Sequence, residues 1–235
     1  MQLFYCDNLP AEGIATLPRE ESHHCVRVLR MVSGDTLTVT DGCGLLCRAT
    51  LLTPDERGCT IEVTERLPDP APRPYSLHVA VAPTKNTARI EWFVEKAVEI
   101  GIDTITPLLC DHSERTTLKT DRLHKIALAA MKQSLHTILP AINEPTRATD
   151  FMAQQDAASQ KFIAHCEGDE RIPMQQICRR GGSVTVLIGP EGDFSPREIE
   201  AALAAGFKPV TFGTSRLRTE TAALYATMLT SIINN

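Results

Sequence analysis

No apolar run in this sequence approaches the ~20 residues that a membrane-spanning helix needs. The first residues also lack the basic and then apolar pattern of a signal peptide, because the only apolar run is Leu3-Phe4-Tyr5-Cys6, and Asp7 and Glu12 interrupt the pattern after it. Both absences lead us to expect a cytoplasmic protein with no membrane partner. At 235 residues the chain is long enough for one or two domains with buried cores.

Paired Cys-x-x-Cys ligands are also missing, although the chain has eight cysteines. Cys43 and Cys47 are the closest pair, and the other cysteines are scattered singly. A zinc site that combines this pair with Cys25, Cys59 and nearby histidines is an open alternative. The spacing favours reduced, partly buried thiols, so we predict no metal and no disulfide framework.

Lysine is absent from the first 66 residues, which hold six arginines against ten carboxylates. The whole chain has a formal net charge of −5. Such a balance excludes a protein that coats nucleic acid with a general positive field. Any nucleic-acid partner must therefore be recognised by a placed cluster of basic side chains.

The pattern along the chain predicts two domains of different class. Residues 36–66 alternate polar and apolar with turn signals between them, which is typical of a β-meander in a small barrel or sandwich. A proline-rich stretch at 68–75 predicts an extended linker. From residue 76 to 235 strands alternate with helices, which predicts an α/β domain with a mostly parallel sheet. The expected domains are thus 1–67 and 76–235.

Two strand–loop–helix junctions near the C-terminus are the strongest candidates for a ligand site. Strand 184–188 runs into loop 189–194, and strand 209–212 runs into loop 213–220. Ligands in open α/β sheets sit beyond the carboxyl ends of strands, and we expect these two loops to be adjacent.

The first loop lacks the Gly-x-Gly-x-x-Gly and Gly-Lys-Ser/Thr patterns that bind phosphate. Glu191 and Asp193 lie in the turn and would repel a phosphate, while Ser195 and Glu198 are spaced as a capping box. A flat, cationic ligand without phosphate, such as S-adenosylmethionine, fits better. The alternative that Gly189 and Gly192 only shape a tight turn stays open.

Arg218 in the second loop precedes a helix N-terminus, where a cation is slightly unfavourable. A residue placed against local preference is a candidate for function, although it could simply pair with Glu191 or Glu220. Other basic residues are candidates for RNA contacts, either on one face of an expected helix from Ser22 to Met31 or on the next domain's first helix: His23, Arg27, Arg30, Lys85, Arg89 and Lys96. Each group could equally be the solvated face of a helix.

The string Leu187-Ile188-Gly189-Pro190-Glu191-Gly192, with Leu217-Arg218-Thr219-Glu220-Thr221-Ala222 after it, resembles the SPOUT RNA methyltransferases. Within them it is most similar to the ribosomal RNA small-subunit methyltransferase E family, which methylates N3 of a uridine in 16S ribosomal RNA. The segment from His24 to Arg30 resembles that family's PUA-like RNA-binding domain, and the segment from Lys85 to Gly101 resembles the start of its catalytic domain.

This resemblance implies an N-terminal PUA-like β-barrel, a C-terminal SPOUT α/β domain with a trefoil knot, a homodimer, and the small ribosomal subunit as partner. The almost wholly apolar helix at 221–233 also suggests a subunit interface. The implied catalytic residue is Arg218, and the implied S-adenosylmethionine site consists of His165, Leu187, Ile188, Gly189, Glu191, Gly192, Phe212, Gly213, Leu217, Arg218 and Thr219.

The chain departs from the family pattern at two places. The family usually has Gly-Gly where this chain has Gly192-Asp193, and it often has Glu-Gln-Ser/Cys-x-Arg where this chain reads Lys132-Gln133-Ser134-Leu135-His136. Three alternatives therefore remain: a nicotinamide- or nucleotide-dependent α/β enzyme, a SPOUT enzyme with another RNA target, and a non-catalytic RNA-binding protein.

Overall fold

The computed structural model describes residues 2–68, 73–155, 159–168 and 171–235. Contact clustering divides the chain into two compact units. The first comprises Met1–Pro72 with Leu128–Leu139, and the second comprises Arg73–Ala127 with Pro140–Asn235. The middle of the predicted proline-rich linker, residues 69–72, lies outside the described residues.

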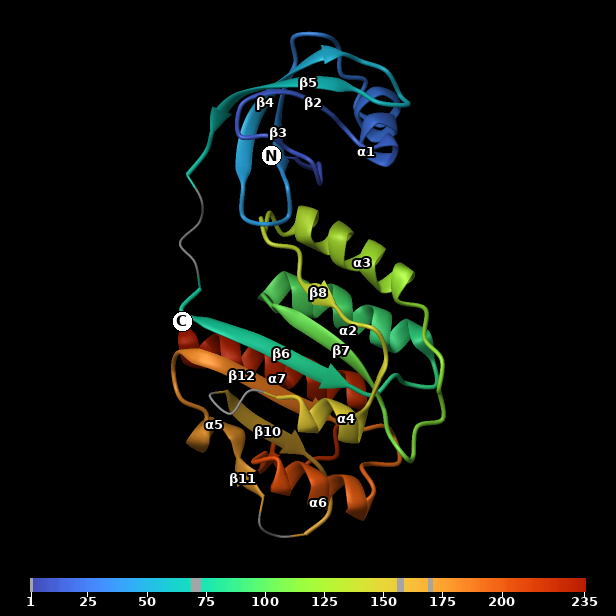
Figure 1. Cartoon of the computed structure of the whole chain (residues 1–235), viewed down its shortest axis with the longest axis vertical. Coiled ribbons are helices and arrows are strands. Elements are labelled where there is room, and N and C mark those ends of the chain that lie inside the picture. The colour runs from blue at the N-terminus through green and yellow to red at the C-terminus, as the bar shows by residue number, and fades with distance from the viewer. Residues whose placement is uncertain (1, 69–72, 156–158, 169–170) are drawn as a thin grey trace. The chain divides into compact units, whose positions relative to one another are not determined.

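The first unit is built on a five-stranded sheet of order β1-β3-β4-β5-β2 (Figure 1). Its strands are β1 (Leu3–Tyr5), β2 (Gly13–Thr16), β3 (Thr36–Thr40), β4 (Leu46–Thr53) and β5 (Thr60–Arg66). Strands β3, β4 and β5 pair antiparallel in sequence order, which confirms the predicted meander. Alternate side chains such as Val39, Ala49 and Ile61 are fully buried, because successive residues of a strand face opposite sides.

The helix expected from Ser22 to Met31 is wrong in length and in type. Helix α1 (Arg19–His23) passes into a π-helical turn, η1 (His24–Val28), and Arg30 then has the left-handed φ of 56°. The amide of Met31 donates to the carbonyl of Cys25 across this end. His23, Arg27 and Arg30 are exposed, but they do not share one α-helical face.

A segment distant in sequence completes the first unit. The carbonyl of Thr137 accepts from the amide of Gly44, at 3.0 Å, and the amide of Leu139 donates to Gly42, at 2.7 Å. Gly42 has a φ of 75°, and a Cβ there would stand 3.0 Å from the Tyr5 ring. A glycine is therefore required where the turn meets this segment.

An ion pair of low exposure also holds this segment in the first unit. The Nζ of Lys132, near the end of α3 (Thr120–Gln133), contacts Oε1 of Glu21, whose residue is only 5% exposed. The second oxygen of Glu21 accepts a long hydrogen bond from the Tyr5 amide, at 3.4 Å. Lys132, which departs from the family pattern, thus neutralises a buried carboxylate.

The second unit contains an eight-stranded sheet in which the paired strands of the described residues all run parallel. Its main path has the order β11-β13-β10-β12-β6-β7-β8, and β9 pairs with β7. The strands are β6 (Tyr75–Val81), β7 (Thr104–Leu109), β8 (Ala141–Ile142), β9 (Thr146–Arg147), β10 (Gln160–Ala164), β11 (Ile172–Pro173), β12 (Gly182–Ile188) and β13 (Lys208–Thr211). The predicted parallel α/β fold is confirmed.

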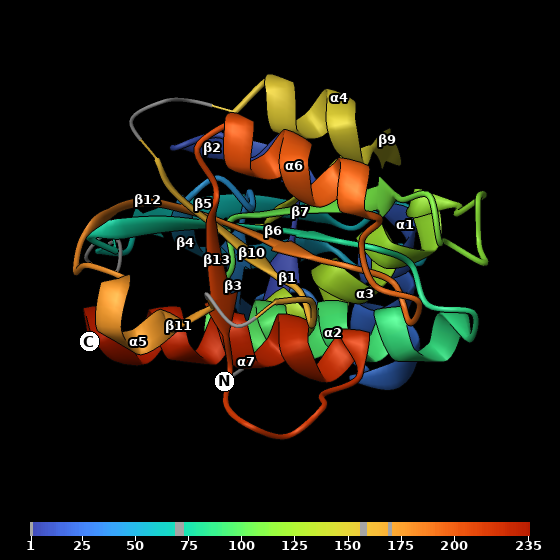
Figure 2. The ribbon, with the colours of Figure 1, turned by 90° about the horizontal axis from the view of Figure 1, so that it is seen from below.

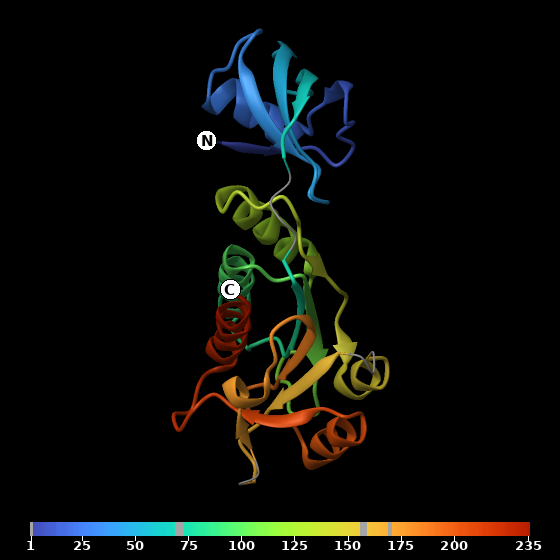
Figure 3. The same ribbon diagram turned by 90° about the vertical axis from the view of Figure 1, so that its left-hand side faces the viewer.

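Helices cover both faces of this sheet, as expected for a parallel sheet. Figures 2 and 3 show α4 (Ala148–Ala153) and α6 (Pro196–Ala204) on one face, and α2 (Thr87–Ile100) and α7 (Thr219–Asn234) on the other. The short helix α5 (Met174–Ile177) completes the set. None of the helices in the described part of the chain is long and apolar enough to span a membrane.

Local sequence signals account for where these helices begin and end. The side chain of Asn86 caps α2 by accepting from the amide of Ala88, and Gly101 ends it with a φ of 109°. Ser195 and Glu198 form the predicted capping box at the start of α6. Because Glu198 also accepts from the amide of Asp111, at 3.0 Å, the same carboxylate ties α6 to the loop after β7.

His78 on β6 is half-buried. Its Nε2 lies 2.7 Å from Oγ1 of Thr106, which also accepts from Nδ2 of Asn143. The ring packs edge-on against Phe151, at 5.1 Å. Burial lowers the pKa of His78 to about 4.

We expect the second unit to lose stability in acid because of His78. The unfolded chain takes up the proton near the ordinary pKa of about 6.5, whereas the folded protein does so only near 4. Stability is therefore full above about pH 6.5 and falls by about 2–3 kcal/mol as the pH drops towards 4. Urea unfolding followed by the fluorescence of Trp92 should show a shallower pH slope in His78→Gln. Equal slopes in the two proteins would contradict the assignment.

The Glu21–Lys132 pair yields a second prediction. Lys132→Met should lower the free energy of unfolding by about 2 kcal/mol, because it leaves the buried carboxylate of Glu21 without its cation. Glu21→Gln combined with Lys132→Met removes both charges and should recover most of that loss. Chemical denaturation of the wild type, Glu21→Gln, Lys132→Met and the double variant measures the coupling, and additive effects would refute it.

Candidate functional site

The predicted ligand loops follow strands that flank β10 in the parallel sheet. Ala164, at the end of β10, is in register with Ile188 of β12 on one side and with Val210 of β13 on the other. The two strands are not neighbours in the sheet, because β10 lies between them. His165, directly after β10, consequently occupies the centre of this carboxyl edge.

The loop after β12 is held by close packing of its glycines. A Cβ at Gly189 would stand 3.0 Å from the ring of Phe194, which is itself buried. A Cβ at Gly192 would stand 3.0 Å from the Cβ of His112. These contacts support the simpler interpretation that both glycines shape the turn. Because a Cβ would be crowded at both positions, the backbone of the turn carries no side chain there.

The acidic residues of this loop have separate partners. Oε1 of Glu191 accepts from the amide of Lys85, at 3.2 Å, which links the loop to the one after β6. The carboxylate of Asp193 accepts from the amides of Cys166, at 2.7 Å, and Phe194, at 2.8 Å. Two carboxylates therefore lie in the loop where a phosphate-binding turn would present free amides.

The loop after β13 meets the first loop at the start of α7. Oγ1 of Thr219 donates to the carbonyl of Gly189, at 3.1 Å, so one hydrogen bond connects the two predicted loops. The ring of Phe212 packs against the ring of Tyr225 on α7, with 5.2 Å between their centroids, and Gly213 has a φ of 124°. Leu217 is half-buried beside them.

Arg218 is the N-cap residue of α7, and its side chain makes no capping hydrogen bond. The acids that could have paired with it have other contacts: Glu191 accepts from Lys85, and Glu220 lies 3.8 Å from Nε of Arg89. Within residues 2–68, 73–155, 159–168 and 171–235, no ion pair is recorded for Arg218 or Arg216. Both are exposed, so their guanidinium groups are available to an anionic partner.

His165 carries two ring nitrogens that are covered from solvent and have no hydrogen-bond partner among the described residues. Burial lowers the pKa of His165, while the nearby Asp193 carboxylate acts in the opposite direction. A neutral imidazole offers one donor and one acceptor. Together with the loop backbones, it suits a ligand with amine and hydroxyl groups.

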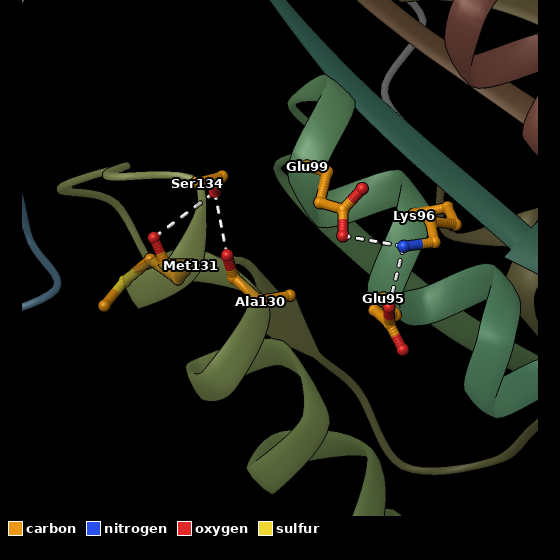
Figure 4. Close-up of polar contacts among 6 residues, drawn as sticks. All are labelled: Glu95, Lys96, Glu99, Ala130, Met131 and Ser134. Carbon is orange, nitrogen blue, oxygen red and sulfur yellow. Dashed lines mark hydrogen bonds and ion pairs between the residues drawn. The ribbon is translucent and has the colours of Figure 1, made fainter.

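Most of the predicted RNA-contacting side chains already have acidic partners. Arg27 pairs with Glu56 at 2.5 Å and Lys85 with Glu114 at 2.8 Å. Figure 4 shows Lys96 between Glu95 and Glu99, at 2.7 and 2.8 Å, and Ser134 bonded to two carbonyls at the end of α3. Exposed pairs are weak, so phosphate groups can replace these acids.

Sequence reasoning missed His112 and Cys166 at this edge. The Nδ1 of His112 lies 3.0 Å from the carbonyl of Gly192 and 3.2 Å from that of Asp193. Both histidines come after a strand of the parallel sheet, His112 after β7 and His165 after β10. The carboxyl ends of the predicted strands were therefore the signal that could have identified them. The missing information was the order of those strands in the sheet.

Comparison with known proteins agrees with this architecture. Residues 71–231 match the family described as RNA methyltransferase domain, and residues 17–64 match the RNA methyltransferase PUA domain. Ribosomal RNA small subunit methyltransferase E of Synechocystis sp. is 30% identical over 92% of this chain and 72% of its own length. The protein of that name from Mycobacterium bovis is 29% identical over 95% of this chain and 88% of its own length.

Solved structures agree over the whole chain. A probable rRNA-methyltransferase from Porphyromonas gingivalis is 40% identical, with a TM-score of 0.93 over 100% of this chain and 98% of that one. Ribosomal RNA small subunit methyltransferase E from Neisseria gonorrhoeae, bound to S-adenosyl methionine, is 25% identical, with a TM-score of 0.87 over the same shares.

These matches span both units and exclude the nicotinamide- or nucleotide-dependent alternative. The chain belongs to the RNA methyltransferases, in the ribosomal RNA small subunit methyltransferase E family.

Proposed function

We propose that this enzyme transfers a methyl group from S-adenosylmethionine to N3 of a uridine in 16S ribosomal RNA, in the cytoplasm. The observation that carries the proposal is the meeting of three loops at one carboxyl edge, closed by the bond from Thr219 to Gly189. The relative from Neisseria gonorrhoeae binds S-adenosyl methionine, which supports the choice of cofactor.

The residues at this edge fit that cofactor. His165 has unpartnered ring nitrogens for a base or ribose hydroxyl, and Gly213 leaves the backbone of its loop open to close approach. Carboxylates in the first loop tolerate a cationic ligand and oppose phosphate. The proposed binding residues are His165, Leu187, Ile188, Gly189, Glu191, Gly192, Phe212, Gly213, Leu217, Arg218 and Thr219.

Arg218 is the proposed catalytic residue. When bound, S-adenosylmethionine supplies a methyl group on a sulfonium, and the uridine must attack it in line from N3. Loss of the N3 proton to a base puts negative charge on O2 and O4 of the uracil. The exposed guanidinium of Arg218 would stabilise that charge, as a fixed cation does in other transition states.

We expect Arg218→Ala to retain binding of S-adenosylmethionine within about threefold but to lower turnover by about 100-fold or more. The assay is methyl incorporation into small-subunit particles from cells that lack this modification, with cofactor affinity measured by calorimetry. Arg216→Ala, in the same loop and equally exposed, is the matched control and should change turnover little.

Wild-type turnover in Arg218→Ala would end this assignment. A wild-type enzyme that binds the cofactor yet never methylates the particles would instead favour the non-catalytic alternative or another RNA target.

We propose that the first unit is the PUA-like barrel that docks RNA. Its exposed basic side chains His23, Arg27 and Arg30 would contact phosphates, together with Lys85, Arg89 and Lys96 of the second unit. Since exchange of a carboxylate partner for phosphate is an electrostatic step, binding should weaken with salt.

We propose that the C-terminal segment forms the family's trefoil knot and that the enzyme is a homodimer. The bond between the start of α7 and the loop after β12 supports the first statement. The second is supported by an apolar stripe on the packed helices α2 and α7, comprising the exposed Trp92, Tyr225, Met228 and Ile232. An exposed stripe of this kind is typical of a subunit interface.

Ile232→Asp should therefore turn the dimer into a monomer, because it places a charge in that apolar stripe. Ile232 is 66% exposed in the single chain and Ile14 in the first unit is 65% exposed, so Ile14→Asp is a matched control. Sedimentation at micromolar concentration distinguishes them. A monomeric wild type, or an Ile232→Asp dimer as tight as the wild type, would refute the interface.

A further inference from the structure

Asp193 joins three loops of the second unit. Its carboxylate accepts from the amide of Cys166, after β10, and from the amide of Phe194 in its own loop. Its amide donates to Pro190 at 3.0 Å, which closes the turn. Its carbonyl lies 3.2 Å from Nδ1 of His112, after β7.

The backbone of Asp193 is held in an unusual conformation. Its φ is 62°, a region that glycine adopts without steric strain and that aspartate tolerates better than most other residues. The chain thus combines a backbone conformation that suits glycine with a carboxylate whose two oxygens both accept backbone amides.

Those two hydrogen bonds decide what Asp193 can do. Both oxygens are already engaged, so the carboxylate is poorly suited to take a proton from a substrate. A carboxylate that accepts two amides is instead a strong connector between loops. The loop that it holds through Cys166 begins with His165, whose ring nitrogens have no hydrogen-bond partner among the residues that the structure describes.

We propose that Asp193 is a positioning residue that fixes His165 in the cofactor pocket by fastening the loop after β10 to the loop after β12. This inference rests on the proposed function, because it takes the pocket between these loops as the S-adenosylmethionine site.

The charges around His165 make the role measurable. Asp193 and Glu167 favour its protonated form, whereas Arg171 and burial oppose it. The guanidinium of Arg171 also holds the His165 carbonyl, at 3.0 Å. Removal of the Asp193 charge should therefore move the titration of the His165 ring to lower pH.

The test compares Asp193→Gly and Asp193→Asn with the wild type. Glycine relieves the backbone and removes both acceptors, while asparagine keeps one acceptor and turns its NH2 donor towards a backbone N–H, which is also a donor. In both variants we expect the dissociation constant of S-adenosylmethionine to rise about tenfold, as the loss of charge-assisted hydrogen bonds predicts. Turnover at saturating cofactor should stay within about threefold, since Arg218 is unchanged.

Two NMR readouts separate positioning from a general loss of stability. Exchange of the Cys166 amide should accelerate, and the His165 ring should titrate at lower pH. Asp41→Asn is the matched control, because Asp41 also accepts two loop amides, from Cys43 and Leu45, but lies in the first unit. It should change neither readout.

Unchanged cofactor affinity in Asp193→Gly would overturn the inference, as would an unchanged Cys166 exchange rate in both variants. If the wild type itself does not bind S-adenosylmethionine, the proposed function fails, and with it the pocket on which this inference rests. The inference is supported if the wild type binds S-adenosylmethionine and both Asp193 variants bind it more weakly.

Discussion

The position of β10 between β12 and β13 is the constraint on which the site depends. Parallel pairing on both sides brings Ala164, Ile188 and Val210 into register, so the three loops that follow them begin at the same edge. The hydrogen bond from Thr219 to Gly189 then closes the edge from outside, across the strand that separates the two loops. His165 lies near both loops because it directly follows β10, which pairs with β12 on one side and β13 on the other.

Much of the fold could be predicted because its signals are local. The bounds of α2 follow from Asn86 at its start and Gly101 at its end, and the capping box at Ser195 identifies α6. Strand order is different, since it depends on tertiary pairing that no periodicity encodes. The contact between the two loops agrees with the prediction that they are adjacent, but the strand β10 between them and the contacts of His112 and Cys166 were not predicted.

The expected helix from Ser22 to Met31 failed for a related reason. Propensity allows an α-helix there, but the backbone instead widens into η1 and turns sharply at Arg30. Cys25 is fully buried in the core of the first unit, so packing decides the local backbone. In the same way, the charge of Lys132 could be read from the sequence, whereas its buried partner Glu21 could not.

The inclusion of Leu128–Leu139 in the first unit also bears on how the chain is made. The turn at Gly42–Gly44 donates a backbone hydrogen bond to Thr137 and accepts one from Leu139, and these two residues are synthesised almost a hundred positions later. During translation, those groups of the first unit therefore stay unpaired until residues 73–127 of the second unit, and then Leu128–Leu139, have left the ribosome. Its folding is completed out of sequence order, and a fragment cut at the proline-rich stretch would be missing a piece of its own core unit.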